Sequence, residues 1–198
     1  MHISTTDFYC YGGYHWKVNN RKSGCYTPIL KTSFEQIFNF HSHHLKMLAI
    51  RYDLHQPSYV LLNKQITVFF RRLSKQLKAK YKIQRLGYIW VREQENAKSP
   101  HYHIVLLLDG KHIMYPGWVN ITSQRIWSEL GGFLYFPPNL YYKTQRGDNK
   151  NMARLIYRVS YLAKARGKGK KPPQTKNYGA SRISFNTKTK TKAFTGYY

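Results

Sequence analysis

The chain has 198 residues, which is enough for one domain with a substantial hydrophobic core and basic extensions. Its 33 lysines and arginines outnumber its 8 acidic residues and leave a formal net charge of +25, which suits a polyanionic partner such as nucleic acid. No apolar run approaches the ~18–20 residues of a bilayer span, and two cysteines do not make a disulfide framework. Because its start shows no secretory leader pattern, we expect the chain in a bacterial or host cytoplasm, with no membrane partner.

The first part of the chain predicts an irregular start, then a helix, a strand and a longer helix. Residues 1–32 are rich in aromatic residues, glycine and asparagine, and residues 33–40 form a short amphipathic stretch that predicts one helical piece. Residues 44–54 carry apolar side chains on both parities, which predicts a central strand. Apolar side chains three and four apart at 59–80 then predict an amphipathic helix.

The middle of the chain predicts an antiparallel hairpin. Residues 85–93 and 101–108 both have strand-like patterns, and a polar turn joins them. A helix is expected at 120–130, where a pair of glycines ends it, followed by an edge strand at 140–144 and a last helix at 151–165.

This order of elements favours an α+β domain. Its central antiparallel sheet of about five strands would carry helices on one side. We expect three parts along the chain: an N-terminal extension at 1–44 that is partly irregular, a folded domain at 45–166, and a basic segment at 167–198 that contacts a polyanion.

Two histidines begin the second hairpin strand, as His101-Tyr102-His103. Side chains two apart in a strand share a face, so both imidazoles project together and could bind one divalent metal ion. A carboxylate would complete the set and suit Mg²⁺ or Mn²⁺. Antiparallel pairing brings the end of the preceding strand beside His101, and Glu93 and Glu95 share parity there. Glu93 lies more firmly within the strand and is favoured, with Glu95 as the alternative.

The predicted last helix carries Tyr157 and Tyr161 one turn apart, with Lys164 three residues further along the same face. A phenol is a poor nucleophile at neutral pH because its ordinary pKa is near ~10. A divalent ion that polarises a phosphodiester, with a lysine that offsets the developing charge, would make its attack feasible. The same spacing also suits ordinary packing of tyrosines on an amphipathic helix.

Together these motifs resemble those of the HUH endonucleases. A histidine-hydrophobe-histidine motif precedes an apolar strand, and Tyr-x-x-x-Tyr-x-x-Lys follows on a later helix, as in the two-tyrosine rolling-circle replication initiators. Gene II-type replication proteins of filamentous phages (inoviruses) and their prophage relatives are similar over a wider stretch within residues 45–185, which includes Tyr88, Glu93, Asp109, Tyr157 and Tyr178-Gly-Ala-Ser-Arg182.

The resemblance implies an HUH/Rep-like fold, with the histidines on a central strand of a five-stranded antiparallel sheet. It implies that His101, His103 and the acid matched by Glu93 hold Mg²⁺ or Mn²⁺. It also implies that Tyr157 or Tyr161 attacks one DNA strand at a replication origin of a phage, prophage or plasmid.

The product of that attack would be a 5′-phosphotyrosine bond and a free 3′-hydroxyl that primes synthesis. The second tyrosine would attack in the termination step and rejoin the strand, and Lys164 matches the family lysine that assists at the metal and phosphate. Residues 1–44 match nothing in the family and no helicase domain follows, so a host helicase and polymerase are the expected partners.

Basic residues near these motifs are the expected DNA contacts because of their charge density: Arg71, Lys75, Arg154, Arg158, Arg166, Lys168, Lys170 and Lys171. Two other functions stay open. The charge alone would suit a non-enzymatic nucleic-acid-binding protein, and the same chemistry occurs in HUH transposases and relaxases. These enzymes rank lower because single-tyrosine transposases lack the paired tyrosines and relaxases usually offer three histidines.

Overall fold

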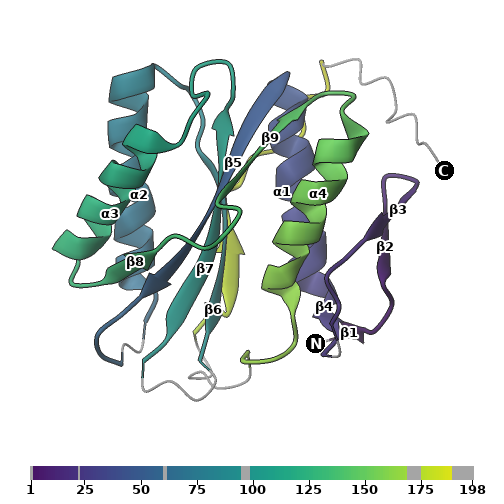
Figure 1. The fold of residues 1–198 in the computed structure, drawn as a ribbon, viewed down its shortest axis with the longest axis horizontal. Coiled ribbons are helices and arrows are strands. Elements are labelled where there is room, and N and C mark those ends of the chain that lie inside the picture. Colours follow the sequence, from purple (N-terminus) through teal and green to yellow (C-terminus); the bar gives the residue numbers. More distant parts are fainter. Residues whose placement is uncertain (1, 22, 60–61, 95–98, 169–174, 189–198) are drawn as a thin grey trace.

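An antiparallel sheet of six strands lies between two pairs of helices in the computed structural model of the protein (Figure 1). The structure describes residues 2–21, 23–59, 62–94, 99–168 and 175–188. Every pair of neighbouring strands in the sheet is antiparallel, which confirms the expected α+β class. The strands lie in the order β10 (Tyr178–Ala180), β6 (Gly87–Glu93), β7 (His101–Asp109), β5 (Lys46–His55) and β8 (Phe133–Tyr135), with β9 (Tyr141–Gln145) also paired to β5.

Helices cover both faces of this sheet, so the prediction that they lie on one side is wrong (Figure 1). α2 (Lys64–Tyr81) and α3 (Gly117–Glu129) pack on one face, and α1 (Thr27–His43) and α4 (Asn149–Ser160) pack on the other. The reason lies in β5 and β7, which are buried at nearly every position regardless of parity. A strand that buries both of its faces needs cover on both sides of the sheet.

Two hydrophobic cores therefore divide the side chains of the central strands by parity. Even-numbered side chains such as Ile50 and Leu106 face α2 and α3, whereas odd-numbered ones such as Ala49 and Val105 face α1 and α4. Because successive side chains of a strand alternate between faces, the odd-numbered histidines at the start of β7 lie on the α1 and α4 side.

Helix α1 is longer than predicted and belongs to the second core. We expected one helical piece at 33–40, but α1 runs from Thr27 to His43, with Pro28 in its first turn, where no amide hydrogen is needed. Gly87 of β6 lets this helix approach the sheet closely, because a Cβ at that position would lie 2.8 Å from the ring of Phe40.

Four short strands precede α1 and form two small sheets where we expected irregular structure. β1 (Ile3–Ser4) pairs with β4 (Cys25–Tyr26), and β2 (Phe8–Tyr11) pairs with β3 (Tyr14–Lys17). Figure 1 shows them beside α1 and α4, on the outer side of that helical layer. The expected domain limits at 45–166 stay a prediction.

Backbone contacts tie this N-terminal region to the end of the last helix. Cys25 forms an isolated β-bridge with Lys164, and the amide of Ala165 donates to the carbonyl oxygen of Gly24 at 3.0 Å. Together with the bonds of Ser160 described next, they hold the segment after α4 against residues far away in the sequence.

The last helix ends earlier than predicted. α4 stops at Ser160, and a 3-10 turn at Tyr161–Ala163 follows it, whereas we expected one helix over 151–165. The hydroxyl of Ser160 donates to the carbonyl oxygen of Tyr157 at 2.9 Å and accepts from the amide of Asn19 at 2.8 Å. A serine that bonds to the preceding turn competes with regular helix geometry, and the backbone extends at Lys164.

The two helices on the other face lie close to their predicted positions. α2 covers most of 59–80 and α3 covers most of 120–130. α2 ends where Lys82 adopts a left-handed conformation with φ of 55° and its amide bonds to the carbonyl oxygen of Lys78. No helix in the described part of the chain is both long enough and apolar enough to cross a membrane.

His41, in the last turn of α1, is buried against β9. Its Nε2 lies 2.8 Å from Oγ1 of Thr144, and its Nδ1 has no hydrogen-bond partner within the described residues. Burial, reinforced by the positive charge of Arg146, lowers the pKa of His41 from 6.5 to about 4. The folded protein therefore keeps this imidazole neutral at pH values where the unfolded chain protonates it.

The protein should lose stability as the pH falls from 6.5 toward 4, because in that interval the unfolded chain binds a proton at His41 and the folded chain does not. The loss in the free energy of unfolding should approach about 3 kcal/mol near pH 4 and should vanish above neutral pH. His41→Gln removes this titrating group. The variant should be less stable than wild type at pH 7, and the difference between their free energies of unfolding, measured with urea, should become smaller or change sign at about pH 4.5. A gap that does not change with pH would contradict this account.

Candidate metal centre and its tyrosine

Strand register brings the two predicted histidines and Glu93 together at one end of the sheet. Glu93, the last residue of β6, pairs directly with His101, the first residue of β7. On the other side of β7, His103 pairs with Asp53 of β5. Because all four residues are odd-numbered positions in register, their side chains project to the face that α1 and α4 cover.

The two imidazoles and the carboxylate of Glu93 meet at their tips. Oε2 of Glu93 is 3.0 Å from Nε2 of His103 and 3.7 Å from Nε2 of His101, and the two Nε2 atoms are 3.2 Å apart. The potential ligand atoms of this half-buried group all lie within 4.8 Å of one another. Two imidazole nitrogens and one carboxylate oxygen are a donor set that fits a divalent ion, so the group could hold one. The alternative ligand, Glu95, lies outside the described residues.

Electrostatics in this group favour an ionised carboxylate. Burial alone would raise the pKa of Glu93, but hydrogen bonds from His101 and His103 and the charge of Lys168 outweigh it and hold the pKa well below its ordinary value. Burial likewise would lower the pKa of His103, yet hydrogen bonds to Asp53 and Glu93 raise it. The two carboxylates thus favour positive charge at His103, which either a proton or a divalent ion supplies.

Asp53 supports His103 from behind and was not predicted as a site residue. Its Oδ1 lies 2.6 Å from Nδ1 of His103, an arrangement that orients the ring and leaves Nε2 facing Glu93. Arg51 donates to both oxygens of Asp53 at 3.2 Å, and the side chains of Arg51, Asp53 and His103 are all buried. A signal was present in the sequence, since Arg51, Asp53 and His55 occupy alternate positions of an otherwise apolar strand.

Lys168 also belongs to this group, although we expected it to contact DNA. Its ammonium is buried and donates to Oε1 of Glu93 at 2.6 Å and to the carbonyl oxygen of Lys164. The two oxygens of Glu93 therefore have separate partners, with Oε1 bound by Lys168 and Oε2 facing the histidines. A buried ammonium paired in this way holds the carboxylate of Glu93 in place and is not presented at the surface.

Of the two predicted tyrosines, Tyr161 lies against His103 of the metal-ligand group, by which we mean the three candidate ligands Glu93, His101 and His103. Its ring centroid is 5.9 Å from that of His103 at an interplanar angle of 81°. Two cations flank the ring: the guanidinium carbon of Arg51 lies 4.8 Å and Nζ of Lys164 lies 4.9 Å from its centroid. Tyr157 lies one turn earlier in α4, half-buried, and makes no ring contact with either histidine among the described residues.

The other expected DNA contacts are scattered over the molecule. Arg154 and Arg166 are exposed near the tyrosine side of the sheet, and Arg158 donates to the carbonyl oxygen of Pro138 at 2.6 Å. Arg71 and Lys75 are exposed on α2, which covers the opposite face of the sheet from the histidines. Lys170 and Lys171 lie outside the described residues.

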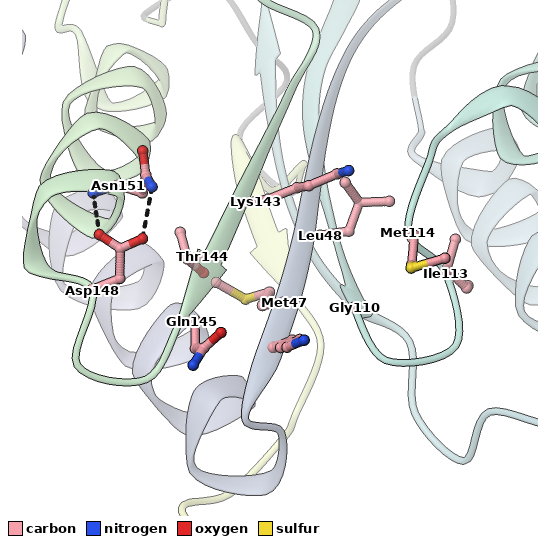
Figure 2. Close-up of a pocket in the computed structure, with 11 residues that line it drawn as sticks. Met47, Leu48, Gly110, Ile113, Met114, Lys143, Thr144, Gln145, Asp148 and Asn151 are labelled. Carbon is pink, nitrogen blue, oxygen red and sulfur yellow. Dashed lines mark hydrogen bonds between the residues drawn. The ribbon is translucent and has the colours of Figure 1, made fainter.

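A cavity of about 340 Å³ lies at the other end of the sheet, away from the metal-ligand group. It opens where β5 begins, between the start of α4 and the turn after β7 (Figure 2). Figure 2 shows Lys143, Met47 and Met114 around it, and Asp148 capping the first turn of α4 through Asn151. Since the cavity holds none of the predicted site residues, it does not contribute to the chemistry considered below.

Mn²⁺ should bind to the wild-type protein and raise its melting temperature, while Glu93→Gln and His101→Ala should abolish both effects because each removes a ligand. Asp53→Asn keeps all three ligands but weakens the support of His103, so its Mn²⁺ affinity should fall about 10- to 100-fold. Isothermal titration calorimetry measures these affinities.

Asp109→Asn is the matched control for that titration. Asp109 is also a histidine-paired carboxylate, with Oδ2 2.8 Å from Nδ1 of His112, but it lies at the far end of β7. Its replacement should leave Mn²⁺ binding unchanged, and equal losses in Asp53→Asn and Asp109→Asn would refute the specific role of Asp53.

Comparison with known proteins gives a family for the chain. No match was found among curated proteins or among solved structures. A family model described as the YagK/YfjJ C-terminal domain matches residues 14–130, a stretch that contains Asp53, Glu93 and both histidines and ends before the tyrosines. Because this match spans more than half of the 198 residues, the chain belongs to the YagK/YfjJ C-terminal domain family.

Proposed function

We propose that this protein is a metal-dependent endonuclease that nicks and rejoins single-stranded DNA through a tyrosine and thereby initiates and terminates rolling-circle replication. One observation carries the proposal: Tyr161, a potential nucleophile, lies against His103, a potential metal ligand, 58 positions earlier in the chain. A hydrophobic core does not require a phenol, two imidazoles and a carboxylate at one point. Phosphodiester cleavage uses each of them, the phenol as a nucleophile and the other three groups as metal ligands.

In the proposed reaction the oxygen of Tyr161 forms a bond to a DNA phosphorus, and the bond from phosphorus to the 3′ oxygen breaks. The phenolic proton passes to solvent, and the 3′ oxygen leaves with a proton taken up from solvent. This step yields a 5′-phosphotyrosine and a free 3′-hydroxyl. A divalent ion, Mg²⁺ or Mn²⁺, held by Glu93, His101 and His103 would polarise the phosphate.

Other residues of the site would position these groups. Asp53 holds His103 in the orientation that presents Nε2, and Lys168 holds the carboxylate of Glu93. Lys164, whose ammonium flanks the Tyr161 ring, is well placed to offset negative charge on the phosphate. Tyr157, one turn away, would serve as the second nucleophile when the strand is rejoined.

Family membership supports the biological setting. Proteins of the YagK/YfjJ family are associated with prophages, which suits a replication protein of a phage or prophage. The chain would work with a host helicase and polymerase, since the proposed chemistry only opens and reseals one strand.

The excess of positive charge keeps one alternative in view, a nucleic-acid-binding protein without catalysis. The protein's net charge of +25 would suffice for salt-sensitive binding to DNA. Both proposals require DNA binding, so only covalent chemistry at a tyrosine separates them.

Tyr161→Phe should abolish the covalent protein–DNA adduct that forms when the wild-type protein meets a labelled random-sequence single-stranded DNA pool with Mn²⁺. We expect a loss of more than about 1000-fold, because a nucleophile is removed. Tyr157→Phe is the matched control and should retain the first adduct. Denaturing gels detect the adduct, and mass spectrometry of the trapped peptide identifies the tyrosine. A full yield of adduct from the Tyr161→Phe plus Tyr157→Phe double variant would refute the assignment of these tyrosines as the nucleophiles.

Removal of the metal should stop cleavage and leave DNA binding in place. EDTA or His101→Ala should reduce nicking to background, while the affinity for single-stranded DNA, measured by fluorescence anisotropy, should change less than about threefold because most of it comes from lysines and arginines. Nicking that persists in EDTA would argue against a metal centre. Binding without any adduct in Mn²⁺ would favour the non-catalytic alternative.

A further inference from the structure

A second hollow surface lies on the opposite face of the sheet from the metal-ligand group. It is a groove of about 700 Å³ between α2 and the edge strand β10, with β6 beneath it. Neither the proposed chemistry nor the expected DNA contacts account for it. We define the groove by Asn63, Lys78, Arg85, Tyr88, Lys176 and Arg182, which represent its two walls, its floor and its two ends.

Charge in the groove has one sign. Lys78 and Arg85 come from α2 and the segment after it, and Lys176 and Arg182 flank β10 on the other wall. No acidic side chain lines it among the described residues. Four cations without an acid, in a concave surface, produce a positive potential that attracts a polyanion.

The floor of the groove is rigid and partly aromatic. The ring of Tyr88 stacks on Phe70 with centroids 3.9 Å apart and planes 11° apart. Gly179 of β10 lies flat on Trp90, since a Cβ there would come within 2.7 Å of the indole nitrogen. These contacts prevent the floor from collapsing or filling the groove.

One end of the groove leads to the metal-ligand strands. Asn63 donates to the carbonyl oxygen of Lys176 at 3.0 Å and accepts from the hydroxyl of Tyr102 at 2.9 Å. Tyr102 stands between His101 and His103 in β7, with its side chain on the groove face. A chain leaving the groove at Asn63 is therefore at the end of the sheet where the two histidines lie on the other face.

We propose that this groove binds the backbone of the DNA strand on one side of the nick, so that the strand continues around the end of the sheet to the metal centre. The inference rests on the proposed function and adds a location for the uncleaved flank. Double-stranded DNA is read by a protruding helix or ribbon that enters its major groove. A single strand lies in a positively charged groove beside aromatic side chains, as this surface offers.

The length of the groove sets the length of DNA it covers. Its floor runs from Leu86, just before β6, to Trp90 of β6, five residues, which at ~3.3 Å per residue spans roughly 16 Å. Stacked nucleotides rise ~3.4 Å each, so the groove covers roughly five of them, and fewer if the strand is extended.

The test compares the DNA affinity of a variant that lacks two cations of the groove with that of a variant that lacks two cations elsewhere on the surface. Lys78→Ala plus Arg182→Ala should weaken binding of a labelled mixed-sequence 20-mer of single-stranded DNA about tenfold and should reduce the slope of log affinity against log salt by about 1.4, the value for two phosphate contacts. Lys111→Ala plus Lys150→Ala changes the charge equally at exposed sites outside the groove and should alter affinity less than about twofold.

Anisotropy is measured in EDTA, so the result does not depend on cleavage. Equal losses in the two double variants, or equal competition by duplex DNA of the same length, would overturn the groove assignment and leave the proposed function standing. Groove-specific losses in a protein that forms no tyrosine adduct would uphold single-strand binding in the groove but reject both the proposed function and the placement of the groove beside a nick. In the cleavage assay, the groove variant and the wild type should differ in adduct yield on full-length DNA. Removal of the roughly five nucleotides that the groove would bind, on one side of the nick, should abolish that difference, because neither protein can then use the groove.

Discussion

The pairing register of three adjacent strands determines the candidate site. Glu93 opposite His101 and Asp53 opposite His103 place two carboxylates and two imidazoles on one face at one end of the sheet. A shift of one residue in either pairing would send the shifted strand's side chains to the other face and into the core under α2 and α3. The shift is unfavourable because it would move charged side chains such as Arg51 and Asp53 away from their partners and into an apolar core. Core packing and site geometry are thus maintained by the same hydrogen-bond ladders.

Much of the fold and half of the site followed from local patterns. His101, His103 and Glu93 lie within a few residues of one another along the chain, so strand parity and a hairpin were enough to predict their proximity. Tyr157 and Tyr161 are likewise close in sequence, so one helical turn was enough to predict that they are neighbours. Asp53 and Lys168 were missed as partners of His103 and Glu93, because contacts across 50 and 75 positions depend on tertiary structure. Their residue types gave only a weak signal, a polar alternation in β5 and one lysine among many.

Errors in the fold have equally physical causes. β8 and β10 contain three residues each, which is too short for a periodic pattern. α1 was underestimated because it begins in a segment whose aromatic and polar composition resembles a loop, and its apolar face is only recognisable against the sheet. Apolar side chains on both parities of β5 indicated two covered faces, but we had assigned helices to one. At Ser160 a side chain that bonds to the backbone ended the helix before the predicted boundary.

The backbone contacts between Gly24, Cys25 and the segment after α4 have a consequence for how the molecule folds. Tyr161 and Lys164 follow a helix end that is held by residues about 140 positions earlier, through the bridge of Cys25 to Lys164 and the bond of Ala165 to Gly24. We expect contacts of such high sequence separation to form late. They cost less loop-closure entropy once the central hairpin and its helices have formed and brought the two ends of the chain closer together. During synthesis the strands that carry the histidines leave the ribosome well before the tyrosine turn. A partly made chain would therefore contain Glu93, His101 and His103 without Tyr161, and Tyr161 would reach His103 only once the first and last parts of the described fold meet.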